Sequence, residues 1–238
     1  MSAPVSIPLT DGASLRGALS MPEGDGTVPG VLVLHESFGL NDDIRRIADR
    51  FAANGYAALA PDLFSHGNRA LCLSRVLLSG ASEAAMDATM ADIEASRRAL
   101  ETQPRVDAAR IAVAGFCLGG GFALVFGARS DVKAAAVNYG SVPRSVSALD
   151  GVCPVVASYG ARDRVFAPHV RRLRTHLESL GVPNDVLEYA DAGHSFLSYD
   201  NAPAWLLRIP NPMQAGYSED AAEDAWRRML AFFAEHVA

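Results

Sequence analysis

The stretch Ile111-Ala112-Val113-Ala114-Gly115-Phe116-Cys117-Leu118-Gly119-Gly120-Gly121 joins an apolar run to a G-x-C-x-G motif, and a helical pattern follows it. The apolar run predicts a buried strand. Glycines two positions before and after Cys117 allow a strand and a helix to approach closely across a sharp turn, in which the central residue is strained and exposed. The stretch therefore predicts a strand–turn–helix unit with the Cys117 thiol at its tip.

Other apolar runs alternate with helical patterns along the rest of the chain. Such alternation predicts an α/β protein with a mostly parallel sheet and helices on both of its faces. A leading antiparallel hairpin is expected around Asp11-Gly12, which brings the sheet to about eight strands. The expected strands are 5–9, 15–20, 30–34, 56–60, 111–114, 134–139, 155–159 and 186–189, and the expected helices are 42–54, 82–100, 168–180 and 218–238.

Composition narrows the class of protein. A chain of 238 residues with 50% hydrophobic and 20% charged residues can bury one core, so we expect a single domain over 1–238. The net charge of -6 gives no reason to expect a nucleic-acid partner. No apolar run approaches the ~20 residues that span a bilayer, and the first residues do not resemble a signal peptide. We expect a cytoplasmic protein, monomer or homodimer, that acts on a small molecule.

The three cysteines, Cys72, Cys117 and Cys153, form no C-x-x-C pair and are odd in number. This argues against a zinc site and against a disulfide framework, so no metal is expected. Buried structural roles are expected for Cys72 and Cys153. Cys117 differs because the N-terminus of the following helix favours a thiolate, which is the nucleophilic form of cysteine.

A cysteine nucleophile needs a base, and the base needs an acid that orients it, in the chain order nucleophile, acid, histidine. Asp163 follows the strand predicted at 155–159, and His194 follows the last predicted strand. Both therefore lie where catalytic groups of parallel sheets collect. Asp163 also has an alternative interpretation as a turn or helix-entry aspartate.

The remaining histidines are weaker candidates for the base. His35 also ends a strand, whereas His66 lies in a loop and has no clear assignment. The other three lie in helical patterns and are expected to be solvated: His169, His176 and His236. The oxyanion that forms during acyl transfer needs two N–H donors, for which the backbone of Leu118 and of Ser37 are the candidates.

At this point the sequence resembles the dienelactone hydrolase family, from His35 to the C-terminal helix. The resemblance rests on five segments: His35-Glu36-Ser37-Phe38-Gly39-Leu40-Asn41, Ala60-Pro61-Asp62-Leu63-Phe64, Gly115-Phe116-Cys117-Leu118-Gly119-Gly120, Gly160-Ala161-Arg162-Asp163 and Ala192-Gly193-His194-Ser195-Phe196. It implies an α/β-hydrolase fold with a Cys-Asp-His triad, no cofactor, and an ester or lactone substrate. It also implies that Glu36 lies beside the nucleophile and takes part in forming the thiolate, which agrees with the partly desolvated position expected for Glu36.

The substrate-binding residues match the family less well. Dienelactone hydrolases carry an arginine two residues after the Gly-His-Ser-Phe motif, where this chain has Ser198. A second family arginine lies in a poorly matching region, where Arg69 and Arg75 are the candidates. The full set of candidate substrate-binding residues is Phe38, Arg69, Arg75, Phe196, Ser198 and Trp205.

The segment 198–217 contains three prolines and an apolar cluster around Trp205, and it is long for a simple connection. Three interpretations are open: a cover over the active site, a self-association patch, or a loop packed on the core. The leading functional hypothesis is hydrolysis of a carboxylic ester or lactone through an acyl-cysteine. The alternative is a catalytically silent protein of the same fold that uses the Trp205 patch to bind a partner.

The absence of an arginine at Ser198 predicts a preference for uncharged substrates. A charge-assisted hydrogen bond to a carboxylate contributes about 1.5–3 kcal/mol, or roughly 10- to 150-fold in affinity. We expect kcat/KM for a neutral lactone to exceed that for its carboxylated analogue, and the test compares the two substrates in the parent protein and in Ser198→Arg. If the parent protein already favours the carboxylated compound strongly, another arginine such as Arg69, Arg75 or Arg208 reaches the substrate and the argument from Ser198 is wrong.

Overall fold

The computed structural model describes residues 1–68, 72, 74, 76, 78, 82–199 and 212–237. The chain divides into two compact units, Met1–Ala112 and Val113–Ala238. The boundary falls inside a continuous strand, β5 (Val106–Phe116), and not in a linker. The prediction that 1–238 forms a single domain therefore stays a prediction, and each unit is described by itself.

Eight strands form the sheet, in the order β1-β2-β4-β3-β5-β6-β7-β8. The first two pairings, β1 with β2 and β2 with β4, are antiparallel, and those of β3 with β4 and from β5 through β8 are parallel. The α/β class with a mostly parallel sheet of about eight strands is thus confirmed. The strands are β1 (Ala3–Pro8), β2 (Ser14–Ser20), β3 (Val28–Leu34), β4 (Ala57–Pro61), β5 (Val106–Phe116), β6 (Ala135–Asn138), β7 (Val155–Gly160) and β8 (Asn184–Tyr189).

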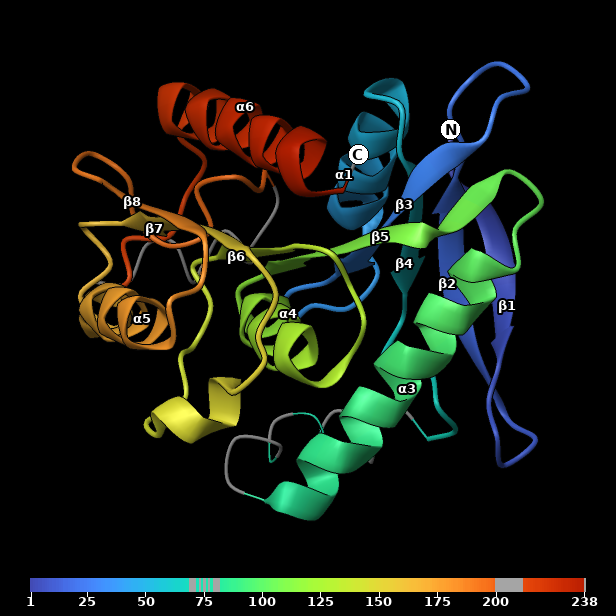
Figure 1. The fold of residues 1–238 in the computed structure, drawn as a ribbon, viewed down its shortest axis with the longest axis horizontal. Helices are drawn as coiled ribbons and strands as arrows, with labels where there is room; N and C mark the ends of the chain where they lie inside the picture. The colour runs from blue at the N-terminus through green and yellow to red at the C-terminus, as the bar shows by residue number, and fades with distance from the viewer. Residues whose placement is uncertain are drawn as a thin grey trace. The chain divides into compact units, whose positions relative to one another are not determined.

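In the first unit, helices cover both faces of the strands. The helix α1 (Asp42–Ala53) packs on β2, β3 and β4, and α3 (Glu83–Glu101) packs on β1, β3 and β4 from the opposite face (Figure 1). The expected hairpin is present, with Val5 opposite Gly17 in antiparallel register. A larger residue in place of Gly17 would be crowded, because its Cβ would lie 3.0 Å from the Ile7 side chain.

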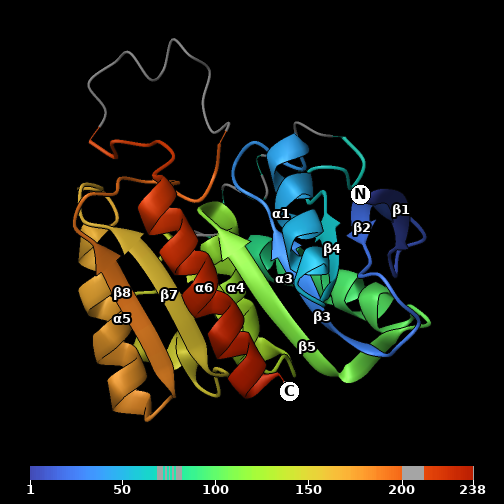
Figure 2. The ribbon, with the colours of Figure 1, turned by 90° about the horizontal axis from the view of Figure 1, so that it is seen from above.

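In the second unit, α4 (Leu118–Arg129) packs on β6, and α5 (Ala167–Leu180) packs on β7 and β8. The C-terminal helix α6 (Glu219–His236) packs on β7 and crosses the other face of these strands (Figure 2). A short 3-10 helix, η1 (Val146–Leu149), lies against α4 and has no counterpart among the sequence predictions. The parallel strands bring several loops to one edge of the sheet, where their C-terminal ends meet.

Capping residues define the boundaries of three helices. The Asn41 side chain accepts a hydrogen bond from the Ile44 N–H at the start of α1, and Ser82 does the same for Ala85 at the start of α3. Gly181 ends α5 in the left-handed conformation, with φ 64°. No helix in the described ranges is long and apolar enough to cross a bilayer.

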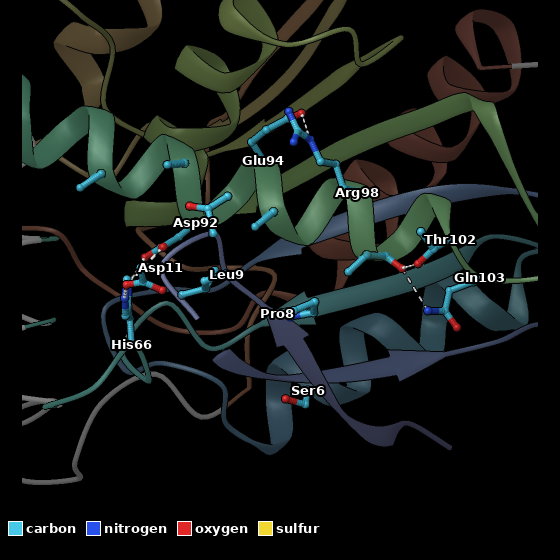
Figure 3. A pocket seen from close by; sticks show the side chains of 15 residues that line it. Ser6, Pro8, Leu9, Asp11, His66, Asp92, Glu94, Arg98, Thr102 and Gln103 are labelled. Carbon is cyan, nitrogen blue, oxygen red and sulfur yellow. Dashed lines mark hydrogen bonds and ion pairs between the residues drawn. The ribbon is translucent and has the colours of Figure 1, made fainter. Parts of the chain in front are cut away.

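The loop residue His66 links the hairpin to α3 in the first unit. Its Nε2 lies 2.9 Å from Oδ2 of Asp11, and its Nδ1 lies 3.2 Å from Oδ1 of the buried Asp92. Only an imidazolium can donate from both nitrogens at once. These three residues lie at one end of a cavity of about 660 Å³ between β1 and α3 (Figure 3). The cavity lining includes none of the candidate catalytic residues.

This arrangement predicts a pH-dependent contribution to stability. Burial lowers the pKa of His66, but the hydrogen bond to Asp11 and the charge of Asp92 outweigh burial, so the pKa lies above its ordinary value of 6.5. A group whose pKa is raised by folding stabilises the fold fully below the pKa of the unfolded chain, and this contribution is lost as pH rises through the folded pKa. The free energy of unfolding of the wild type should therefore fall, relative to His66→Gln, as pH increases from about 5.5 to 8.5.

Urea unfolding of both proteins at several pH values measures this difference. Asp92→Asn is the matched variant, because it removes the buried carboxylate and keeps the imidazole. It should reduce the pH dependence without abolishing it. A constant difference between wild type and His66→Gln across this range would contradict the bridging role of His66.

Candidate active site

The chain turns sharply at Cys117, between β5 and α4. Cys117 has φ 53° and ψ -112°, a conformation that is strained for a residue with a side chain. Its backbone N–H donates to the carbonyl of Asn138 at 3.0 Å, which ties the turn to the end of β6. A Cβ on Gly115 would lie 2.0 Å from the Gly119 carbonyl oxygen. The glycine before the cysteine is therefore required for strand and helix to come this close, as the motif predicted.

The Cys117 side chain is half-buried and immediately precedes the first residue of α4, Leu118. The Leu118 N–H lies in the first helical turn, where backbone N–H groups have no acceptor within the helix. The two other cysteines differ in their surroundings. Cys72 is buried and its Sγ donates to the His66 carbonyl, and burial raises the pKa of Cys153 to about 12. Both observations agree with the structural roles expected for them.

Asp163 lies in the turn between β7 and α5 and is 1% exposed. Its two carboxylate oxygens have separate partners. Oδ1 accepts hydrogen bonds from the backbone N–H groups of Val165 and Phe166 at 3.1 and 3.2 Å, and Oδ2 accepts from Nδ1 of His194 at 2.6 Å. The same carboxylate therefore bonds both to the backbone of its own turn and to the histidine, and the catalytic role of Asp163 stays a prediction.

The His194 ring contacts two aromatic side chains and the Asp163 carboxylate. Phe166 packs on it with ring centroids 4.7 Å apart, and Tyr139 packs at 5.0 Å. With Nδ1 bonded to Asp163, the other nitrogen, Nε2, is buried and has no hydrogen-bond partner within the part of the chain that the structure describes. A buried polar atom without a partner is uncommon and marks a place where a reacting group can bind.

The protonation of His194 depends on both other candidates. Burial lowers the pKa of the imidazole, but the hydrogen bond to Asp163 and the interaction with the side chain of Cys117 outweigh burial and raise the pKa to about 9. Asp163 and Cys117 thus both favour the protonated imidazole. The structure brings Cys117, Asp163 and His194 together, in the arrangement that a nucleophile, a base and an orienting acid require.

The loop that carries His194 is anchored by residues that the sequence did not identify. The His194 N–H donates to the Met213 carbonyl at 2.8 Å, and its own carbonyl accepts from the Gly216 N–H at 3.0 Å. A Cβ on Gly193 would lie 1.8 Å from the Gln214 carbonyl oxygen, so the two segments touch along their backbones. The only sign of this contact in the sequence is Gly193, since a glycine permits close backbone approach. It does not reveal which segment lies against it.

The candidates at positions 35–38 belong to the first unit. His35 is buried: Leu63 N–H donates to its Nε2 at 3.1 Å, so Nδ1 carries the proton and donates to the Glu36 carbonyl at 2.6 Å. The same carbonyl accepts from the Gly39 N–H, which closes the turn that contains Ser37. Glu36 is 4% exposed, which agrees with the partly desolvated position expected for it. Ser37 and Phe38 are exposed. The roles of Glu36, Ser37 and Phe38 in catalysis or binding stay predictions.

Two of the candidate substrate-binding residues are placed in the interior. Phe196 is 0% exposed and packs on Tyr139 and Tyr189, and Ser198 is 1% exposed with its Oγ 3.2 Å from the Tyr139 hydroxyl. Both side chains therefore pack inside the protein, and their contact with a substrate stays a prediction. An arginine at position 198 would need this interior to rearrange, so the comparison of substrates in the parent protein is the sharper test of charge preference. Arg69, Arg75, Trp205 and most of the 198–217 segment lie outside the described residues.

Two histidines on α5 that were expected to be solvated are half-buried, and each also forms a hydrogen bond that the sequence did not reveal. His169 Nδ1 accepts from the Val142 N–H at 2.8 Å, and His176 Nε2 lies 3.2 Å from the Pro143 carbonyl oxygen. Burial lowers the pKa of His169. Both rings hold the loop after β6 against α5, and helical periodicity could not reveal that partner.

Comparison with known proteins agrees with the fold and with the motifs. The model of the dienelactone hydrolase family matches residues 15–237. A protein from Salmonella typhimurium with the name "Putative carboxymethylenebutenolidase" is 31% identical, and the match covers 98% of this chain and 92% of that one. A protein of the same name from Methylorubrum extorquens is 28% identical, over 98% of this chain and 80% of that one.

Solved structures show the same likeness in three dimensions. The Klebsiella pneumoniae structure titled "Putative Dienelactone Hydrolase" has a TM-score of 0.80 at 28% identity, over 99% of this chain and 98% of that one. A dienelactone hydrolase-like promiscuous phosphotriesterase, P91, from metagenomic libraries has a TM-score of 0.84 at 26% identity, over 100% and 99% of the two chains. The fold and the turn at Cys117 define an α/β-hydrolase. Within that class, the chain belongs to the dienelactone hydrolase family.

The two carboxylate oxygens of Asp163 have different partners, so two substitutions can separate its contact with the turn from its contact with His194. Asp163→Asn keeps an oxygen for the Val165 and Phe166 N–H groups but replaces the charge beside Nδ1, whereas Asp163→Ala removes both interactions. We expect Asp163→Asn to lower the turnover rate by on the order of 10²- to 10⁴-fold at nearly unchanged melting temperature. Asp163→Ala should lower both.

The pH profile gives a second readout. The hydrogen bond to Asp163 is the largest single contribution that raises the His194 pKa to about 9, so the alkaline limb of kcat/KM should move to lower pH in Asp163→Asn. Steady-state kinetics from pH 6 to 10, with thermal melts as control, measure both effects. A fully active Asp163→Asn variant would make Asp163 a turn residue only.

Proposed function

We propose that the protein hydrolyses a carboxylic ester or lactone through a covalent acyl-cysteine intermediate. The observation that carries this proposal is the His194 imidazole, which is bonded to Asp163 through Nδ1 and presents a buried Nε2 without a partner on the side where Cys117 acts. Membership of a hydrolase family supports the class of reaction. Cys117 is then the nucleophile, His194 the proton carrier and Asp163 the orienting acid.

The raised pKa of His194 favours a protonated imidazole at neutral pH, and the proposed acylation starts with Cys117 as its thiolate. The Cys117 Sγ attacks the carbonyl carbon, and the carbonyl oxygen takes the electron pair. The negative oxygen is stabilised by the Leu118 N–H at the start of α4. Two groups of the first unit stay predicted participants: the Ser37 N–H as a second donor to this oxygen, and the Glu36 carboxyl in forming the thiolate.

The tetrahedral intermediate then collapses, the C–O bond breaks, and the imidazolium gives its Nε2 proton to the leaving oxygen. In a lactone this oxygen stays attached to the acyl group as a hydroxyl. Deacylation uses the now neutral imidazole, which takes a proton from water while the hydroxide adds to the thioester carbon. The C–S bond breaks, a carboxylic acid leaves, and the thiolate–imidazolium pair is restored.

The substrate is proposed to be uncharged near the reacting carbonyl. Position 198, where related enzymes carry an arginine, holds a serine whose hydroxyl bonds to Tyr139 inside the protein. No cationic side chain is therefore supplied from this position to pair with a substrate carboxylate. Short aryl esters and neutral lactones are the substrates of choice for a first test.

The experiment combines turnover with identification of the covalent intermediate. Cys117→Ala should lose turnover of a neutral aryl ester to near background while its melting temperature changes little. Rapid quenching of the wild type, followed by mass spectrometry, should show the acyl group on Cys117, and iodoacetamide should modify Cys117 before Cys72 or Cys153.

Cys153→Ala is the matched control, since it removes a half-buried cysteine outside the site and should keep full activity. Hydrolysis by Cys117→Ala at the wild-type rate would overturn the proposal. Failure of the wild type to hydrolyse or to form an adduct with any ester or lactone in the panel would favour the catalytically silent alternative instead.

A further inference from the structure

Tyr139, at the end of β6, occupies an unusual backbone conformation next to the candidate active site. Its φ is 43°, in the left-handed region that is costly for a bulky aromatic residue. Its side chain is 0% exposed, and its N–H donates to the Ser158 carbonyl on β7 at 2.8 Å. Strained residues persist where the surroundings determine them strongly, and they collect at functional sites.

The strained conformation turns the Tyr139 ring toward His194. The ring packs on the imidazole at 5.0 Å and on Phe196 at 5.6 Å. Its hydroxyl forms a hydrogen bond of 3.2 Å with Ser198, which is buried and lies four residues after the histidine. Tyr139 therefore contacts the His194 loop at the histidine itself and again beyond it.

The preceding residue, Asn138, holds the nucleophile. Its carbonyl accepts the Cys117 N–H at 3.0 Å, and its side-chain amide donates to the Gly115 carbonyl at 3.2 Å. Two consecutive residues at the end of β6 thus hold Cys117 and His194 through separate contacts. Any shift of this strand end changes the position of the base relative to the nucleophile.

We propose that Tyr139 is a positioning residue that fixes the His194 imidazole relative to Cys117, through its ring and through the hydrogen bond to Ser198. The reaction that Tyr139 affects in this inference is the proposed function, whereas the contacts of Tyr139 do not depend on that function. It also gives Ser198 a role that differs from substrate contact. The serine hydroxyl is the partner that holds the Tyr139 ring against the histidine.

The test uses Tyr139→Phe and Ser198→Ala. Each variant removes the same hydrogen bond, from one end or the other, and each keeps the contact between the aromatic ring at position 139 and the His194 imidazole. Each should lower kcat for a neutral aryl ester by about 3- to 30-fold with little change in KM, because a base that is displaced slightly loses rate and not substrate binding. The double variant should lower kcat no more than either single variant does, since all three lack the same hydrogen bond.

Alkylation of Cys117 by iodoacetamide provides a readout that does not depend on hydrolysis. A less well-placed imidazolium stabilises less thiolate, so the alkylation rate near pH 6.5 should fall by about 3- to 10-fold in both variants. The alkaline limb of kcat/KM should move to lower pH, because the hydrogen bond between His194 and Asp163 is less well maintained. Slower alkylation in these variants would support the proposal even if no ester is hydrolysed by the wild type.

Tyr189→Phe is the matched control. It removes a tyrosine hydroxyl that bonds to Asp224 and Arg228 of α6, and it keeps the ring contact with Phe196. It should lower the melting temperature without changing alkylation or kcat. If Tyr139→Phe behaves in the same way as this control, Tyr139 has only a structural role. If Tyr139→Phe slows the reaction and Ser198→Ala does not, the hydroxyl does not act through Ser198, and the proposal is wrong.

Discussion

The close approach of β5 and α4 across Cys117 is the constraint on which the second unit depends. With φ 53° at Cys117, the helix begins at the residue after the strand turn, and an added Cβ on Gly115 would lie 2.0 Å from the Gly119 carbonyl. A left-handed residue other than glycine costs about 1–2 kcal/mol, so the surrounding contacts have to maintain it. One of them is the hydrogen bond from the Cys117 N–H to the Asn138 carbonyl on the neighbouring strand. Chemistry at the thiol therefore depends on sheet pairing that lies beneath it.

The same logic extends along the C-terminal ends of the parallel strands. β5 carries Cys117, β6 ends in Asn138 and Tyr139, the turn after β7 carries Asp163, and the loop after β8 carries His194. Hydrogen bonds between neighbouring loops supply the order, with the Asp163 carboxylate shared by its own turn and by the histidine. The polar groups that hold the turn thus also hold the candidate catalytic side chain, and a substitution at one of them changes both contacts.

Burial and charge oppose each other at His194, and their balance decides its chemistry. Packed between Phe166 and Tyr139, an imidazole without a charged neighbour would lose its proton more easily, because burial disfavours the charged form. Asp163 and Cys117 reverse this effect and raise the pKa of the ring to about 9. His66 in the first unit shows the same balance between burial and two carboxylates, in a place where it joins structural elements.

The sequence by itself determined the strand–turn–helix unit, the alternating α/β order and the capped ends of α1, α3 and α5. These depend on local propensity and on residues within a few positions of one another. It also pointed to Cys117, Asp163 and His194, because residues that follow parallel strands gather at one edge of the sheet. Only the tertiary structure decided that Ser198 is buried against Tyr139, 59 residues away, and that the Met213 backbone accepts from His194. Contacts between distant loops are set by how the strands pair and how the loops pack, and no periodicity in the chain records which loop will lie against which.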